Sequence, residues 1–174
     1  MNNYKKILII GCPGAGKTYF TNLLKKVVNI QVYHLDDLYW KENWQETSKE
    51  EWIKIQKNIL AKKEFIIDGN YLSSLEMRLK SAELVIYLDK SLISCLLGFF
   101  KRTIKNFFKI EINLPKRITN KLTENGMLDF CKYIINFHLH EKYKLNNLLE
   151  KYKNNIEIVI IKNRKDIKTF FERY

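Results

Sequence analysis

Short apolar runs alternate along the chain with segments whose apolar residues recur at helical spacing. The apolar runs predict five strands, at residues 4–10, 31–35, 64–67, 84–88 and 156–161. The helical spacing predicts helices over residues 17–28, 48–62, 91–108, 127–152 and 164–173, and another from Ser73. Alternating strands and helices are typical of an α/β fold with a parallel sheet that helices cover on both faces. The length of 174 residues suits a single domain over residues 1–174.

Two of the predicted helices carry a signature at their start. Ser48 is followed three residues later by Glu51, and Ser73 by Glu76. In such a capping box, the serine hydroxyl accepts a bond from the first turn and the carboxylate bonds back to the serine N–H. We therefore expect helices to begin beside Ser48 and Ser73.

Residues 11–18, Gly-Cys-Pro-Gly-Ala-Gly-Lys-Thr, lie between the first strand and the first helix. They match the full G-x-x-x-x-G-K-[ST] phosphate-binding loop, whose glycines let backbone N–H groups converge on a polyphosphate. Lys17 would reach the β- and γ-phosphates, and the Thr18 hydroxyl would ligate Mg²⁺. The sequence thus predicts ATP and Mg²⁺ as cofactors. The predicted nucleotide-binding residues are Gly11, Cys12, Pro13, Gly14, Ala15, Gly16, Lys17, Thr18 and Tyr19.

Three acidic residues follow predicted strands, at the sheet edge where ligands collect in open parallel sheets. Asp68, after residues 64–67, is the first choice for a second Mg²⁺ ligand. Asp89 is expected to cap the helix that follows it. Asp36, after the second strand, is a candidate to hold an acceptor hydroxyl, to accept its proton or to orient a magnesium-bound water, or else to be a helix cap or turn residue.

Cations and aromatic residues complete the predicted site. Phosphoryl transfer needs positive charge around the moving group, and Arg78, Arg102 and Arg117 are the candidates. Trp40 and Trp44 are expected either to line the acceptor pocket or to pack beneath a helix. Residues 109–126, basic and without periodicity, are expected to form a mobile lid or an ordinary surface loop.

The formal net charge is +12. The lysines are spread along the chain, so the excess of positive charge is better explained by a generally basic composition together with a phosphate-binding site. A surface patch that binds nucleic acid stays the alternative. No apolar run approaches the ~20 residues of a membrane span, and the first apolar run leads straight into the phosphate loop. The protein is therefore expected to be cytoplasmic. Neither the three cysteines nor the three histidines are spaced as metal ligands, so no structural metal site is predicted.

Residues 163–166, Asn-Arg-Lys-Asp, suggest a GTPase as an alternative. They resemble the guanine-reading N-K-x-D sequence. However, Asp68 is followed by Gly69-Asn70-Tyr71, which lacks the acid-x-x-Gly spacing of a switch motif. GTP recognition is therefore the weaker interpretation.

The motif series as a whole resembles the bacterial DNA topology modulation protein family, which belongs to the P-loop kinases related to adenylate kinase. The resemblance is carried by residues 35–40 (Leu-Asp-Asp-Leu-Tyr-Trp), 66–71 (Ile-Ile-Asp-Gly-Asn-Tyr) and 82–89 (Ala-Glu-Leu-Val-Ile-Tyr-Leu-Asp), and by Lys101-Arg102. It implies a five-stranded parallel sheet in the order 2-3-1-4-5, a lid after Arg102 and an ATP–Mg²⁺ site. The chain departs from the pattern at Gly98, where relatives usually carry an arginine against the adenine ring.

Together these features predict an ATP–Mg²⁺-dependent kinase that transfers the γ-phosphoryl group to a small acceptor, such as a nucleotide or nucleoside. Lys17, Arg102 and Asp36 are the predicted catalytic residues, Asp36, Trp40 and Arg78 the acceptor site, and Thr18 and Asp68 the metal ligands. The alternative is an ATP-binding regulator that acts on DNA, which the family resemblance and the charge favour.

Overall fold

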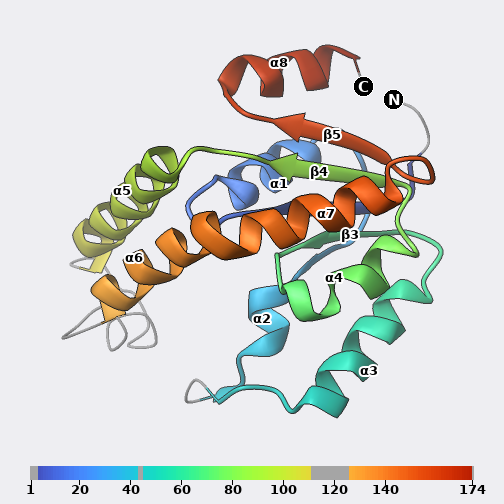
Figure 1. Cartoon of the computed structure of the whole chain (residues 1–174), viewed down its shortest axis with the longest axis horizontal. Helices are drawn as coiled ribbons and strands as arrows, with labels where there is room; N and C mark the ends of the chain where they lie inside the picture. The colour runs from blue at the N-terminus through green and yellow to red at the C-terminus, as the bar shows by residue number, and fades with distance from the viewer. Residues whose placement is uncertain (1–3, 43–44, 111–125, 174) are drawn as a thin grey trace.

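The fold is built on a five-stranded sheet in which every strand pair is parallel, as seen in a computed structural model that describes residues 4–42, 45–110 and 126–173 (Figure 1). Its order is β2-β3-β1-β4-β5. The strands are β1 (Lys6–Gly11), β2 (Val32–His34), β3 (Phe65–Asp68), β4 (Leu84–Leu88) and β5 (Glu157–Ile161). Strands β3 and β4 are buried throughout, as expected for parallel strands covered on both faces. The predicted α/β class and strand order are confirmed.

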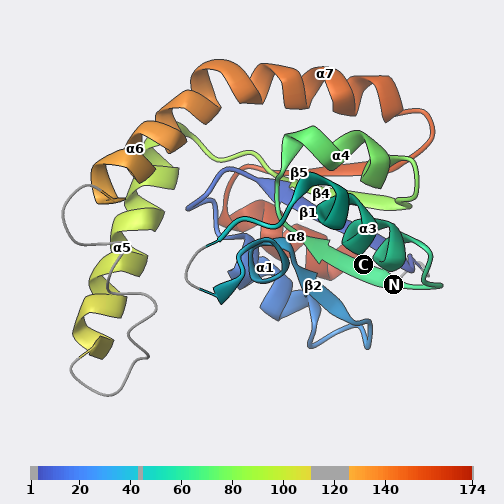
Figure 2. The same cartoon turned by 90° about the horizontal axis from the view of Figure 1, so that it is seen from below.

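Helices cover the two faces of the sheet (Figure 2). On one face lie α1 (Lys17–Leu24) and α8 (Arg164–Arg173), joined by an edge contact between the rings of Phe20 and Phe170 at 5.2 Å. On the other face lie α4 (Leu72–Leu79) and α7 (Lys142–Tyr152), with α3 (Lys49–Leu60) packed against α4. The core is the apolar sheet between these layers.

Helices α5 (Leu92–Ile110) and α6 (Gly126–Asn136) lie side by side beyond the carboxyl ends of the strands (Figures 1 and 2). The prediction of one continuous helix over residues 127–152 is wrong in one respect. A π-helical turn, η2 (Phe137–Glu141), separates α6 from α7. Residues 111–125, which form most of the predicted lid and include Arg117, lie outside the described residues.

Two local predictions also need correction, and one is confirmed. The second strand ends at His34, so Asp36 stands in the first turn of a short helix, α2 (Leu35–Tyr39). Helix α4 begins at Leu72 with Tyr71 before it, so the expected capping box from Ser73 does not form. At the start of α3, the Glu51 N–H donates to Ser48 Oγ at 3.3 Å, as predicted.

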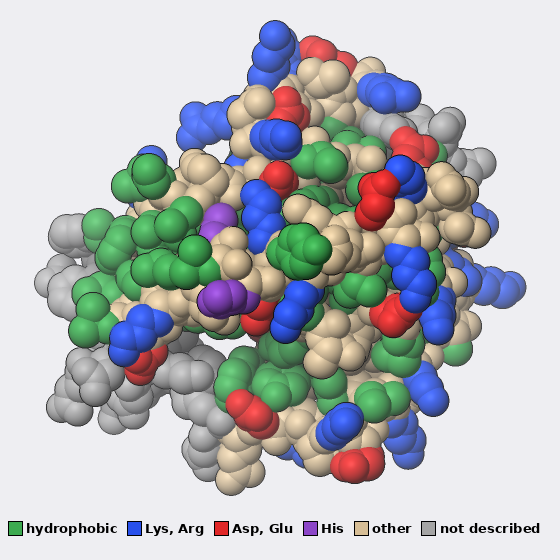
Figure 3. All heavy atoms as spheres, in the orientation of Figure 1, with side chains coloured by type: hydrophobic (Ala, Val, Ile, Leu, Met, Phe, Trp, Pro, Cys, Tyr) green, Lys and Arg blue, Asp and Glu red, His purple; other side chains and the backbone are tan. Residues whose placement is uncertain are grey.

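Exposed hydrophobic side chains gather over α5 and α6 in the space-filling view (Figure 3). On these two helices Ile93, Leu97 and Leu128 are each more than half exposed. On the same face, lysine and arginine side chains are scattered among acidic ones. Among the described helices, none is sufficiently long and apolar to cross a membrane.

Candidate active site

The phosphate loop joins β1 to α1 in a tight turn. Gly14 and Gly16 have φ values of 80° and 92°, in the left-handed region that glycine adopts without strain. Lys17 Nζ donates to the carbonyl oxygens of Gly11 at 3.0 Å and Cys12 at 3.3 Å. Its ammonium group is therefore folded over the loop itself, where the phosphates are predicted to bind.

The other predicted loop residues differ in exposure. Ala15 is buried and Pro13 half-buried. Thr18 is exposed in the first turn of α1, and Tyr19 beside it is 63% exposed. The Thr18 hydroxyl is thus open to a ligand, as a metal ligand must be.

Helix α5 packs directly against this loop. A Cβ atom on Gly98 would lie 2.2 Å from the Gly14 carbonyl oxygen, and one on Gly14 would lie 2.1 Å from the Cys95 carbonyl oxygen. Backbone meets backbone here, an approach that a side chain would prevent. Gly98 thus serves to bring α5 onto the phosphate loop.

The carboxylate of Asp68 stands at the carboxyl end of β3 and is 6% exposed. Its Oδ2 accepts hydrogen bonds from Thr21 Oγ1 at 3.3 Å and from His34 Nδ1 at 3.0 Å. Its Oδ1 is buried and has no hydrogen-bond partner within the described ranges. A buried carboxylate oxygen without a donor suits a hard cation or its water, so Asp68 has the chemistry of the predicted Mg²⁺ ligand. Its joint action with Thr18 stays a prediction.

His34 was not among the predicted site residues, and strand register explains its place. It is paired with Asp68 across the parallel strands β2 and β3. The hydrogen bond to Asp68 raises the pKa of His34, although burial opposes the shift. The signal that could have found it is its position, because His34 is the last residue of the strand next to that of Asp68.

Arg78 corrects one prediction. Its side chain has no exposed surface, and its guanidinium donates to the carbonyl oxygens of Gly69 at 3.0 Å, Asn70 and Tyr71 at 2.8 Å. Burial lowers the pKa of Arg78 to about 9, so the group remains charged at neutral pH. Arg78 therefore positions the loop after β3, and this role replaces the acceptor contact expected from the sequence.

The loop held by Arg78 carries Tyr71 to Asp36. The Tyr71 hydroxyl donates to Asp36 Oδ1 at 2.9 Å, and its ring packs against Tyr39 and Trp52 with centroids 4.9 and 5.0 Å apart. Tyr71 has a φ of 36°, in the left-handed region that side chains rarely adopt. Burial raises its pKa above the usual range, and the charge of Asp36 adds to this. The phenol thus stays protonated and fixes the Asp36 carboxylate.

Trp40 borders the same aromatic group. Its ring meets that of Tyr39 edge-on, with centroids 5.2 Å apart, and it is half-buried. Trp44 lies outside the described residues. Packing against a neighbour is therefore part of what Trp40 does, and a contact with an acceptor stays a prediction.

Helix α6 and the turn η2 border the candidate acceptor region on the side away from Tyr71 and Trp40. The charges of Glu141 and Asp36 act on Tyr133, and burial raises the pKa of this phenol to about 12. Burial also raises the pKa of Glu141. Figure 3 shows the surface hollowed between α6 and α2. Neither Tyr133 nor Glu141 was predicted, because nothing in their local sequence marks which way that helix faces.

Arg102 lies exposed on α5, with its guanidinium 6.0 Å from the ring centre of Phe99 and 5.7 Å from that of Phe130. These cation–π contacts hold it on the α5–α6 pair. Its predicted contact with a phosphate group stays a prediction.

The expectation that Asp89 caps α5 is wrong. Its carboxylate pairs with Lys142 Nζ at 2.6 Å. The cap is provided by Ser91, whose hydroxyl accepts a bond from the Ser94 N–H at 3.3 Å.

The segment that resembles a guanine-reading sequence has a local structural role. Asn163 Oδ1 accepts bonds from the N–H groups of Lys165 and Asp166, and Asp166 Oδ2 accepts from those of Lys162 and Asn163. This reciprocal pair is a capping box at the start of α8. Both side chains are engaged there, so the geometry gives no support to the GTPase interpretation.

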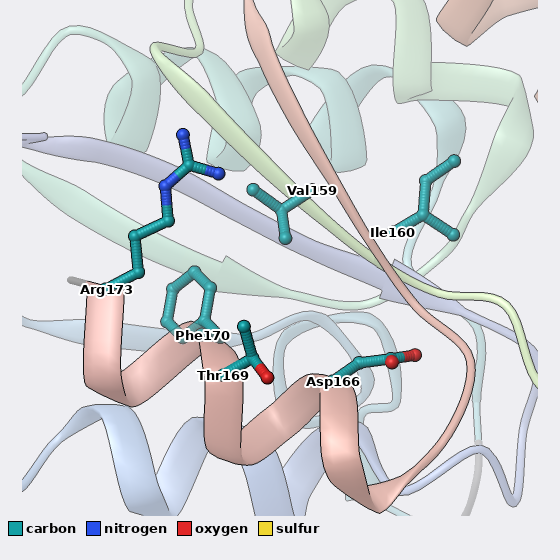
Figure 4. A pocket seen from close by; sticks show the side chains of 6 residues that line it. All are labelled: Val159, Ile160, Asp166, Thr169, Phe170 and Arg173. Atoms are coloured by element: carbon teal, nitrogen blue, oxygen red, sulfur yellow. The ribbon is translucent and has the colours of Figure 1, made fainter.

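A pocket of about 230 Å³ lies beside α8 (Figure 4). It is lined by Val159, Ile160, Asp166, Thr169, Phe170 and Arg173. None of these residues was predicted for catalysis. All of them lie on β5 or α8, so the lining includes neither the phosphate loop nor Asp68.

Comparisons with known proteins agree with the fold. No protein-family model matches the sequence, and no curated protein matches it either. Shikimate kinase from Bacteroides thetaiotaomicron is similar in structure, with a TM-score of 0.51 and 16% identity over 98% of this chain and 96% of that one. Shikimate kinase from Acinetobacter baumannii, in complex with shikimate, gives 0.51 and 15% over 98% and 93%.

Deoxyadenosine kinase from M. mycoides, with a TM-score of 0.49 and 13% identity over 96% of each chain, is also among the matches. The chain thus shares its fold with these two shikimate kinases. These matches do not bear on the resemblance to the bacterial DNA topology modulation family, which stays a prediction.

Proposed function

We propose that this chain is an ATP–Mg²⁺-dependent, single-domain kinase that transfers the γ-phosphoryl group of ATP to a hydroxyl of a small acceptor. The observation that carries the proposal is the joint placement of a phosphate loop and a buried carboxylate. Lys17 folds over the loop, and Asp68 Oδ1 stands without a partner on the neighbouring strand, within the described part of the chain. Kinase folds among the similar structures support the reaction class.

The nucleotide half of the reaction rests on the loop and the start of α1. Backbone N–H groups of the loop and the α1 dipole would hold the phosphate oxygens. Lys17 would exchange its loop carbonyls for β- and γ-phosphate oxygens, which are stronger acceptors because they are charged. Thr18 and Asp68 would hold Mg²⁺, which when bound offsets the negative charge of the phosphates.

The acceptor half rests on the region between α2, Tyr71 and α6. Tyr71 occupies Asp36 Oδ1, which leaves Oδ2 to accept a hydrogen bond from an acceptor hydroxyl. As the acceptor oxygen bonds to the γ-phosphorus, its proton passes to Asp36 and the bond to the ADP leaving group breaks. The neutral phenol of Tyr133 adds a hydrogen-bond donor for a polar acceptor, whereas the Tyr71 oxygen can only accept, because its one proton is donated to Asp36. Arg102 is proposed to supply charge at the transferred group.

The test is a phosphate-transfer screen of ATP–Mg²⁺ against nucleotides, nucleosides, sugars and other small alcohols, read by mass spectrometry. The Lys17→Ala variant should lose turnover while its circular dichroism and melting temperature stay those of the wild type. Lys26→Ala, which removes an exposed lysine near the end of α1, is the matched control and should keep full activity. If Lys17→Ala phosphorylates an acceptor at the wild-type rate, the proposal is wrong.

The net charge of +12 favours a second candidate, an ATP-binding regulator that acts on DNA. Such binding would rest on phosphate contacts and would weaken steeply as salt rises. A filter-binding titration at low salt tests it, and the absence of retained DNA would remove it.

A further inference from the structure

Two cysteines and a histidine from three separate segments meet behind the phosphate loop. Cys12 belongs to the loop, Cys95 to α5 and His138 to the π-helical turn η2. Cys12 Sγ, Cys95 Sγ and a ring nitrogen of His138 all lie within 4.8 Å of one another. The two cysteines are 1% and 0% exposed, and His138 is half-buried. No metal site was expected from the sequence at these residues, because they are far apart along the chain.

The spacing of these atoms suits a tetrahedral cation. Zinc–sulfur bonds of about 2.3 Å and zinc–nitrogen bonds of about 2.0 Å place neighbouring ligand atoms roughly 3.5–3.8 Å apart. Cys12 Sγ and His138 Nδ1 are 3.8 Å apart. The remaining distances, at most 4.8 Å, would need to close by about 1 Å, which side-chain rotation can provide.

The second ring nitrogen of His138 has the partner that metal-bound histidines usually have. Nε2 lies 3.1 Å from the Lys90 carbonyl oxygen, and a proton on Nε2 donated there would leave Nδ1 free to bind a cation. Nδ1 also lies 3.0 Å from the Ile134 carbonyl oxygen, so the ring would turn slightly to bind a cation. The π-helical turn that carries His138 is a feature that occurs frequently at functional sites.

The chemistry of the three groups selects the cation. Thiolate sulfur and imidazole nitrogen favour zinc and other soft or borderline cations over Mg²⁺, which prefers oxygen. The hydrogen bond between the thiols lowers the pKa of Cys95 and raises that of Cys12, and burial raises both, so Cys95 is the thiol that ionises first. The ammonium groups of Lys17 and Lys142 add positive charge that also favours the Cys95 thiolate, the form that binds metal.

We propose that Cys12, Cys95 and His138 form a binding site for a thiophilic divalent cation of the Zn²⁺ type, with a fourth position for water. Such a cation would tie the phosphate loop to α5 and to η2, on the buried side of the loop. This site is distinct from the Asp68–Thr18 pair, which offers only oxygen atoms. It goes beyond the proposed kinase activity and does not depend on it.

The test uses the full chain, reduced and freed of metal by a chelator, and titrated with Co²⁺ as a spectroscopic probe without nucleotide. Thiolate–cobalt bonds absorb in the near ultraviolet, whereas cobalt at Asp68 and Thr18 would not. We expect saturation at one Co²⁺ per chain, displacement by Zn²⁺, and a higher melting temperature with Zn²⁺. His138→Gln and Cys95→Ser should each weaken binding by 10- to 100-fold or more, by the scale of metal-site substitutions.

Cys131→Ser is the matched control, since Cys131 lies on α6 outside the cluster; it should bind Co²⁺ as the wild type does. Far-ultraviolet circular dichroism establishes that each variant is folded, and His138→Gln, at a half-buried position, tests the site if Cys95→Ser fails to fold. The proposal is overturned if the reduced wild type shows no thiolate–cobalt absorption. It is also overturned if folded His138→Gln binds Co²⁺ as tightly as the wild type does, or if the absorption disappears in Cys131→Ser.

Discussion

Gly98 provides a sharp test of how the phosphate loop is supported. In the structure, a Cβ atom at this position would lie 2.2 Å from the carbonyl oxygen of Gly14. Ordinary contact begins near 3.4 Å, so Gly98→Ala requires α5 and the loop to separate by about 1.2 Å. Neither atom belongs to a flexible side chain, and the strain therefore falls on the backbone of both segments.

The magnitude follows from two opposing effects. Replacing glycine by alanine inside a helix stabilises it by about 1 kcal/mol. Overpacking a close contact costs about 1–3 kcal/mol, and a backbone-to-backbone clash belongs at the upper end. We expect a net loss of about 2 kcal/mol in the free energy of unfolding, or roughly 4–8 °C in melting temperature for a chain of this size.

The assay is urea unfolding followed by circular dichroism, with a melting curve as a second measurement. Leu97→Ala, next to Gly98 but 54% exposed, is the control and should change the free energy of unfolding by about 0.5 kcal/mol or less. ATP binding measured by calorimetry should weaken in Gly98→Ala, because the loop shifts with α5. If Gly98→Ala is instead more stable than the wild type by about 1 kcal/mol, helix propensity alone is acting and α5 does not rest on the loop.

Three further predictions concern the residues around Asp68 and Asp36. Arg78→Met should lower the free energy of unfolding in urea by about 3 kcal/mol, because three buried carbonyl oxygens lose their donor; unchanged stability with weaker acceptor binding would instead restore Arg78 as a substrate ligand. His34 has a raised pKa in the folded state, so it stabilises the fold below its usual pKa of about 6.5 and this stability is lost as pH rises through the raised value. Melting temperatures without Mg²⁺ should therefore fall above that pH in the wild type and less so in His34→Asn, and equal slopes would refute the pair with Asp68. Asp36→Asn should lower kcat by about 10²–10⁴-fold while ATP affinity measured by calorimetry stays constant; a loss confined to ATP affinity would contradict the acceptor role.

The sequence alone determined the parallel strands and the phosphate loop of this protein. Apolar runs separated by helical periodicity indicate buried parallel strands, because burial on both faces demands continuous apolar residues. The phosphate loop is likewise local, since its residues are contiguous and its glycines permit the turn. The Ser48 cap of α3 was predictable for the same reason, although the Glu51 carboxylate pairs with Lys41. The one at Ser73 was not, because packing of the loop after β3 starts α4 one residue before Ser73, at Leu72.

Tertiary structure alone decided how distant residues serve the site. Strand register places His34 against Asp68, and complete burial turns Arg78 from a candidate ligand into a support for the loop. The π-helical turn directs His138 toward two cysteines from other segments. Local periodicity indicates which residues are buried, but not which of them meet. That depends on how helices pack on the sheet, and packing is a property of the whole chain.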